Sequence, residues 1–105
     1  MAQFSEDARD DGVCVVRTAG DLDLAAAEDF IEVVRASLGR CTTVELDLGD
    51  VTFIDSSGLG ALVRLRKEAE AGGASLRLTK VSAATDRLLR LTGLVDSFDI
   101  HISQD

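Results

Sequence analysis

The sequence predicts an α/β fold in which a small mixed β-sheet carries helices mainly on one of its faces. Short stretches whose apolar residues recur every second position alternate with longer stretches whose apolar residues recur every three or four. Strand–helix–strand order favours parallel pairing through right-handed crossovers. A period of two in the strands indicates a sheet that is buried mainly on one face. The chain has 105 residues, and this length leads us to expect a single domain over residues 1–105.

The expected strands begin with a hairpin. Residues 1–11 are polar and acidic, and they contain at most a weak edge strand, suggested by the alternation of Phe4, Glu6 and Ala8. The turn dipeptide Asp11-Gly12 follows. The remaining strands are marked by valine content or by clean alternation: "VCVVRTAG" (13–20), "TVELDL" (43–48), "SLRLT" (75–79) and "FDIHIS" (98–103).

Three helices are expected between these strands, each with one apolar face. The apolar positions are Leu24, Ala27, Ile31, Val34 and Leu38 in the first helix, Leu59, Leu62, Val63 and Ala69 in the second, and Ala84, Leu88 and Leu91 in the third. Asp23 and Ser82 stand at N-cap positions. Glycines follow the helices at Gly39, at Gly72-Gly73 and at Gly93, where Leu94 predicts a Schellman ending.

Charge and composition exclude two classes of partner. The chain has 11 Lys and Arg against 19 Asp and Glu, a net charge of −8 that repels phosphate backbones. It has no Trp or Tyr to stack on bases. No apolar run approaches the roughly 20 residues of a membrane helix, and the polar N-terminus is no signal peptide. We therefore expect a cytoplasmic protein that binds neither nucleic acid nor membrane.

Cys14 and Cys41 are the only cysteines, and they form no C-x-x-C pair. Structural disulfides are rare in the cytosol. We therefore expect two inert, partly buried thiols that behave as small hydrophobic residues, with a redox role as the alternative.

The stretch "TFIDSSGLGALV" (52–63) joins an apolar run to the second helix. Asp55, Ser56 and Ser57 give three candidates for one N-cap. Gly58 and Gly60 weaken the first turn by up to about 1 kcal/mol each relative to Ala, and they allow another group to approach the backbone closely. A helix N-terminus also tolerates a phosphate. The residues are therefore compatible with simple capping or with a phosphorylation switch at an exposed serine.

Other chemistries fit the sequence less well. The G-x-S-x-G pattern of a nucleophile elbow is absent around Ser57. The only histidine, His101, falls on the polar face of the last expected strand, where we expect it to be solvated. Asp21, Asp23 and Asp55 could gather and bind a hard cation, but capping and loop solvation are the simpler interpretation. We expect no catalytic residue, no metal and no cofactor.

Three stretches of the chain resemble the STAS-domain family: "AGDLD" (19–23), "LGDVTFIDSSGLGALVRLRKEAEAGG" (48–73) and "LLRLTGLVDSFDI" (88–100). The resemblance runs from about Gly12 to Ile102 and is greatest to bacterial anti-sigma-factor antagonists of the sporulation and stress-response type. The D-S-S-G-L-G box with its flanks is specific, whereas G-D-L-D alone is weak. The family's fold, a small sheet with helices mostly on one side, agrees with the periodicity.

The resemblance implies a regulatory function. In that family the anti-sigma factor is a serine kinase that phosphorylates the box serine. The unmodified antagonist binds this kinase and so frees the sigma factor, and a serine phosphatase restores the serine. By its position in the D-S-S-G-L-G box, the serine that corresponds to the family's phospho-acceptor is Ser57. The implied partner-binding residues are Asp21, Asp23, Asp55, Ser56, Ser57, Gly58, Leu59 and Gly60.

The chain departs from the family pattern at its end. Members carry a further C-terminal helix, and here only "HISQD" is present. We therefore expect Leu94, Phe98 or their neighbours to be unusually exposed, in a monomer with weak self-association. Three other functions remain alternatives: a STAS component of a larger stress-signalling complex, an accessory STAS subunit of a membrane transport or lipid-transfer system, and an enzyme that uses Ser57.

Overall fold

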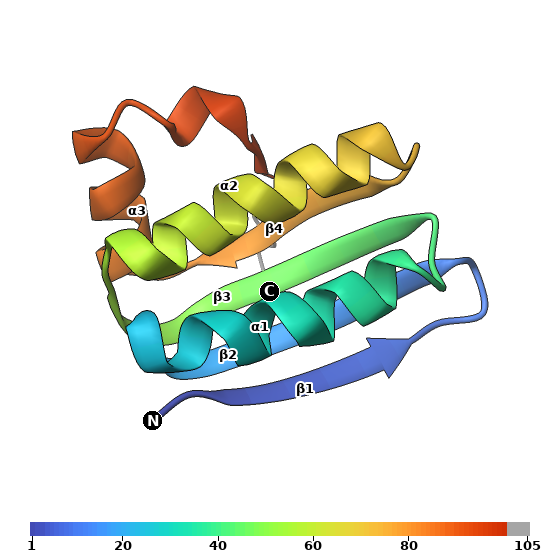
Figure 1. The fold of residues 1–105 in the computed structure, drawn as a ribbon, viewed down its shortest axis with the longest axis horizontal. Coiled ribbons are helices and arrows are strands. Elements are labelled where there is room, and N and C mark those ends of the chain that lie inside the picture. Colours follow the sequence, from blue (N-terminus) through green and yellow to red (C-terminus); the bar gives the residue numbers. More distant parts are fainter. Residues whose placement is uncertain (101–105) are drawn as a thin grey trace.

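The computed structural model of the protein describes residues 1–100, which form one five-stranded sheet and three α-helices (Figure 1). The elements in chain order are β1 (Gln3–Ala8), β2 (Val13–Leu22), α1 (Leu24–Leu38), β3 (Thr43–Ile54), α2 (Ser56–Ala71), β4 (Ser75–Val81), α3 (Ala83–Leu91), the short 3-10 helix η1 (Val95–Ser97) and β5 (Asp99–Ile100). The strands lie in sequence order; β1 pairs antiparallel with β2, and all other pairs are parallel. The predicted fold class is confirmed.

Helices α1 and α2 lie side by side over one face of the sheet, and α3 lies at the end where β3 and β4 finish (Figure 1). Alternate strand residues such as Val44, Leu46 and Leu48 are buried beneath the helices. On β3 the intervening Asp47 stays partly exposed and pairs with Arg17 of β2 at 3.8 Å and Lys80 of β4 at 4.0 Å. No helix within residues 1–100 is long and apolar enough to cross a membrane.

The β2–β3 pair extends further than the sequence predicted. The alternation ends at Leu48, yet β3 continues to Ile54, with Val51 and Ile54 buried. Register shifts between the two strands accommodate the break in pattern. As a result, Leu22 and Ile54, the last residues of β2 and β3, stand opposite each other. The two helices that follow therefore start side by side at one edge of the sheet.

The helix ends are partly as predicted. Ser82 caps α3 by accepting a hydrogen bond from the Thr85 N–H at 3.2 Å. Gly93 has φ 74°, and the Leu94 N–H reaches the Leu89 carbonyl at 2.9 Å, which confirms the Schellman ending. Gly39 follows α1 as predicted, but it stands at the C-cap with φ −75° and does not adopt the left-handed conformation of Gly93.

The predicted apolar stripe of α3 is confirmed only in part. Ala84 and Leu88 are partly buried against the core, whereas Leu91 is 74% exposed. The fully buried residues of this helix are Thr85 and Leu89, because α3 packs at the end of the sheet and not flat on its face. The expected exposure of Phe98 is wrong. This ring is 8% exposed, and the Arg66 guanidinium lies 5.5 Å from its centroid.

The last expected strand is only partly described. β5 comprises Asp99 and Ile100, paired with Arg77 and Leu78 of β4. The remainder of the predicted strand, residues 101–103 with His101, lies outside the described residues.

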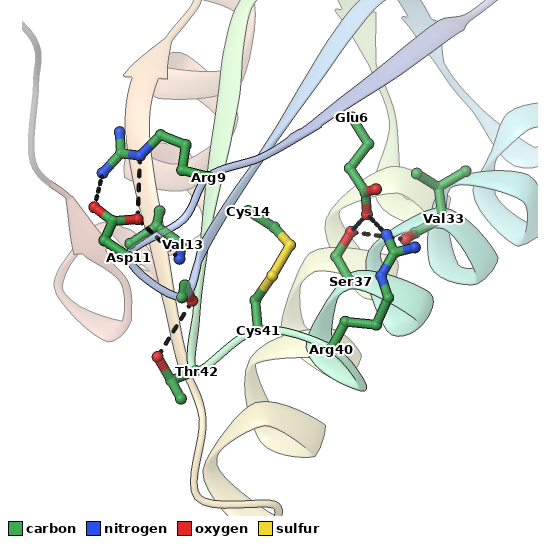
Figure 2. Close-up of a disulfide and its surroundings, with 11 residues drawn as sticks. Glu6, Arg9, Asp11, Val13, Cys14, Val33, Ser37, Arg40, Cys41 and Thr42 are labelled. Atoms are coloured by element: carbon green, nitrogen blue, oxygen red, sulfur yellow. Dashed lines mark hydrogen bonds and ion pairs between the residues drawn. A yellow bond between two sulfur atoms is a disulfide. The ribbon is translucent and has the colours of Figure 1, made fainter.

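The two cysteines are not free thiols. Cys14 and Cys41 form a disulfide with a Cα–Cα separation of 5.9 Å, which overturns the expectation of two inert thiols (Figure 2). The parallel register explains the pairing, because Val13 stands opposite Thr43 where β2 and β3 begin. Cys14 follows the first of these residues, and Cys41 precedes the second by two positions. The crossover through α1 therefore returns the chain beside its own starting point.

The first turn of α2 packs directly on the end of β2. A Cβ atom added at Gly58 would overlap the Leu22 carbonyl oxygen and would lie 2.9 Å from Ile54 Cγ1. The absence of a side chain at residue 58 is therefore what allows this close approach. Gly60, two residues later, is exposed, and a Cβ atom added there would meet no other heavy atom within 4 Å.

These two glycines make a matched pair of substitutions. We expect Gly58→Ala to lower the free energy of unfolding by about 1–3 kcal/mol, the usual cost of overpacking. Gly60→Ala should raise it by up to about 1 kcal/mol, since alanine favours the helix and meets nothing. Urea unfolding measures both values. Equal effects of the two substitutions would contradict the packing of α2 on Leu22.

The disulfide encloses 27 residue steps of chain, which contain most of β2 and all of α1. Chain-entropy arguments give a closed loop of this length about 3–4 kcal/mol of stabilisation. Reducing the bridge in the wild-type protein should therefore lower the free energy of unfolding by about that amount relative to the oxidised protein. Replacing both cysteines by serine should lower it further, because a serine at buried Cys14 adds an unpaired hydroxyl to the core. Equal stability of oxidised and reduced wild type would show that the bridge does not form.

Candidate functional site

The site is built on two helix N-termini that lie side by side. Asp23 and Asp55 follow β2 and β3, and they have nearly the same backbone conformation, φ −111° and ψ −171° against φ −115° and ψ −171°. Each is the N-cap of the helix that follows it. The Asp55 N–H donates to the Leu22 carbonyl at 3.5 Å, which ties the two strand ends together. The edge of the sheet thus presents two capped helix starts.

Asp55 alone provides the cap of α2. Its Oδ1 accepts hydrogen bonds from the N–H groups of Ser57 at 2.9 Å and Gly58 at 3.2 Å. Ser56 is exposed and Ser57 is partly exposed. Within residues 1–100 neither serine hydroxyl takes part in a hydrogen bond. Both hydroxyls are therefore left over after the helix has been capped.

The other predicted site residues differ in their contacts and in their solvent exposure. Asp23 caps α1 by accepting a hydrogen bond from the Ala26 N–H at 3.1 Å. Asp21 is 43% exposed at its side chain and lies 3.4 Å from both the Met1 amino group and the Thr52 hydroxyl. Leu59 is buried, as is Gly58, so these two residues support the surface from beneath. Gly60 lies at the surface.

Two large apolar side chains at this edge were not among the predicted site residues. Leu24, the first residue of α1, is 76% exposed, although the sequence placed it on the buried helix face. Phe53 is 50% exposed, and its Cα stands opposite Asp21. Phe53 also lines a groove of about 370 Å³ together with Leu88 and Leu91 of α3. The sequence signal was the apolar pair Phe53-Ile54 at a strand end, where only one of the two residues can face the core.

The side chains whose pKa is clearly shifted lie elsewhere in the fold. A hydrogen bond from Ser37, together with Arg40, lowers the pKa of Glu6, which lies on β1 beside the C-terminal end of α1. A hydrogen bond from Arg35 lowers the pKa of Glu68, further along α2. The part of the chain that the structure describes has no group of three or more His, Cys, Asp or Glu placed to hold a metal ion. The edge thus offers hydroxyls, carboxylates and apolar side chains, a chemistry suited to recognition and modification.

Comparisons with known proteins agree with this architecture. The model of the STAS domain family matches residues 6–105. The chain is 34% identical over 90 residues to the anti-sigma-B factor antagonist of Bacillus subtilis, which covers 86% of this chain and 83% of that protein.

Solved structures show the same fold. A putative anti-sigma factor antagonist from Thermotoga maritima superposes with a TM-score of 0.84 at 27% identity, covering 96% of this chain and 87% of that one. The Bacillus cell fate determinant SpoIIAA, in its phosphorylated form, superposes with a TM-score of 0.73 at 24% identity over 93% of this chain and 90% of that one. Because the family model matches nearly the whole length of the chain, the protein belongs to the STAS domain family.

Proposed function

We propose that the protein is an anti-sigma-factor antagonist controlled by phosphorylation of Ser57. In this proposal the unmodified protein binds an anti-sigma factor that is itself a serine kinase, and the sigma factor is released. Phosphorylation of Ser57 ends the binding, and a serine phosphatase restores it. Relatives named as antagonists of anti-sigma-B and anti-sigma F factors support the regulatory class.

The observation that carries the proposal is that Asp55 caps α2 and leaves the hydroxyls of Ser56 and Ser57 without a role in the cap. A serine in this position is usually explained as a helix cap. Here Asp55 fills that role with both of its hydrogen bonds, so capping does not account for Ser56 or Ser57. A hydroxyl that is accessible and not needed by the helix can accept a phosphate without loss of local structure. SpoIIAA, a protein of the same fold, has been solved in both unphosphorylated and phosphorylated forms.

Asp55 also changes what a phosphate would do at this helix. A phosphate at a helix N-terminus is normally stabilised by free N–H groups. The N–H groups of Ser57 and Gly58 already donate to the Asp55 carboxylate. A phosphate on Ser57 would add about −1.5 to −2 charges beside that carboxylate. The group would therefore project toward solvent, and in a complex toward the partner, where it would obstruct contact.

The exposed neighbours fit a protein partner. Leu24 and Phe53 present large exposed apolar side chains at the same end of the sheet as the serines. Exposed apolar groups rimmed by polar ones are typical of protein interaction surfaces. Carboxylates at Asp21 and Asp23, with the net charge of −8, favour a partner whose facing surface is basic. We propose that the kinase covers these residues together with Ser56, Ser57 and Gly60.

The most direct test uses variants of Ser57. We expect Ser57→Ala to bind the kinase persistently and to gain no phosphate, seen as the absence of an increase of about 80 Da in intact mass. Ser57→Glu should bind at least about a hundredfold more weakly, a difference of about 3 kcal/mol. The Ser57 hydroxyl makes no hydrogen bond within the described residues. The circular dichroism spectrum of Ser57→Glu should therefore be unchanged, and the Tm of this variant should lie within about 5 °C of wild type.

Ser56→Ala is the matched control, and it should still be phosphorylated at Ser57. Phosphate mapped to Ser56, or wild-type affinity of Ser57→Glu, would contradict the proposal. Unfolding of Ser57→Glu would also contradict it, since the effect would then act on stability. Intact-mass measurement of the protein isolated from its own cells, before and after stress, detects the modification even when the kinase has not been identified.

Asp23 allows capping and recognition to be separated. Asp23→Ala should cost about 1 kcal/mol of stability through loss of the cap on α1. Asp23→Ser keeps a capping oxygen and removes the charge, so we expect it to restore most of that stability. If the carboxylate contacts the kinase, both variants should bind more weakly by calorimetry. Wild-type binding by Asp23→Ser would leave Asp23 with a structural role only.

A further inference from the structure

The Cys14–Cys41 bridge joins two segments of different accessibility. Cys14, the second residue of β2, is fully buried in the core. Cys41 lies in the connection between α1 and β3 and is partly exposed. A small thiol that approaches from solvent therefore meets Cys41 first, because the core encloses Cys14.

Contacts other than the disulfide also hold this end of the molecule. The Ser37 hydroxyl and the Arg40 guanidinium both donate to the Glu6 carboxylate of β1 (Figure 2). The Thr42 N–H donates to the Gly12 carbonyl at 3.0 Å, and the Thr42 hydroxyl donates to the same oxygen at 3.2 Å. These bonds flank the bridge on both sides. They would keep the two sulfurs near each other after the S–S bond has opened, so that it can form again.

Helix α1, which ends shortly before Cys41, is also held along its length. Arg35 donates two hydrogen bonds of 2.8 Å to the Glu68 carboxylate of α2. Phe30, Ile31 and Val34 are buried in the core. Opening the bridge would therefore leave the last turn of α1 and the connection that follows held only by the bonds to Glu6 and Gly12, while most of the helix stays packed.

From this arrangement we propose that Cys14–Cys41 is a reversible thiol–disulfide switch, opened at Cys41 by a small thiol, that controls how firmly the C-terminal end of α1 and residues 39–42 are held to the sheet. This inference concerns the chain alone and does not depend on the proposed function.

The chemistry balances as two exchange steps. In the first, a thiolate attacks Cys41 Sγ, the bond to Cys14 Sγ breaks, and the electron pair leaves on the Cys14 sulfur, which takes up a proton. In the second, another thiolate attacks the sulfur of the bound small thiol. Cys41 then leaves as a thiolate and is protonated. Two small thiols are oxidised to one small disulfide as the protein disulfide is reduced to two thiols, and re-oxidation by a small disulfide runs the same steps backwards.

Glutathione, as the small-thiol probe, tests the site of attack in the wild-type protein. Oxidised protein is mixed with reduced glutathione, quenched with acid and mapped by mass spectrometry. We expect glutathione on Cys41 in the trapped intermediate. Glutathione found on Cys14 would overturn the assigned direction of attack. Two free thiols in the protein under oxidising conditions, before glutathione is added, would show that the bridge does not form.

Hydrogen exchange of the whole chain tests the structural effect. At exchange times short enough that β3 and β4 stay protected, amides of residues 36–42 should exchange at least about tenfold faster in the reduced protein, and oxidised glutathione should reverse the change. The Cys14→Ala plus Cys41→Ala variant is the control and should not respond to either reagent. Unchanged exchange on reduction would show that the bridge controls nothing. Loss of the circular dichroism spectrum on reduction would show a fixed staple and not a switch.

Discussion

The pairing of β2 with β3 is the constraint on which the rest of the structure depends. Their parallel register fixes both ends of the molecule at once. At one end, Leu22 opposite Ile54 brings two helix starts together. At the other, Val13 opposite Thr43 brings two cysteines within bridging distance. The close approach of α2 to β2 at Gly58 follows from the first of these, because the helix begins directly over the neighbouring strand.

Much of the fold was predictable from the sequence because its signals are local. Alternation in "TVELDL" and "SLRLT" marks buried strands, and Asp23 and Ser82 act as caps through atoms a few residues away. The candidate site was predictable as a location, since the stretch around Asp55 combines a strand end, a helix start and surplus polar groups. Its exact division of roles was not, because any of Asp55, Ser56 and Ser57 can cap a helix.

The remaining features depend on non-local geometry. The disulfide could be found only from the register of two strands about 30 residues apart, whereas compartment arguments pointed the other way. The exposed side of α3 depends on where the helix sits, and its Leu91 matches the apolar period without meeting the core. Phe53 is exposed because Ile54, its neighbour on β3, takes the position that faces the core.

The cap at Asp55 has a consequence for the speed of the proposed response. Since the first turn of α2 is held by a residue other than the serines, the domain has no helix start to build or dismantle when Ser57 is modified. Under the proposed switch, no slow refolding step stands between modification and its effect on binding. The delay between signal and response would then be determined by the turnover of the kinase and the phosphatase and by dissociation of the complex.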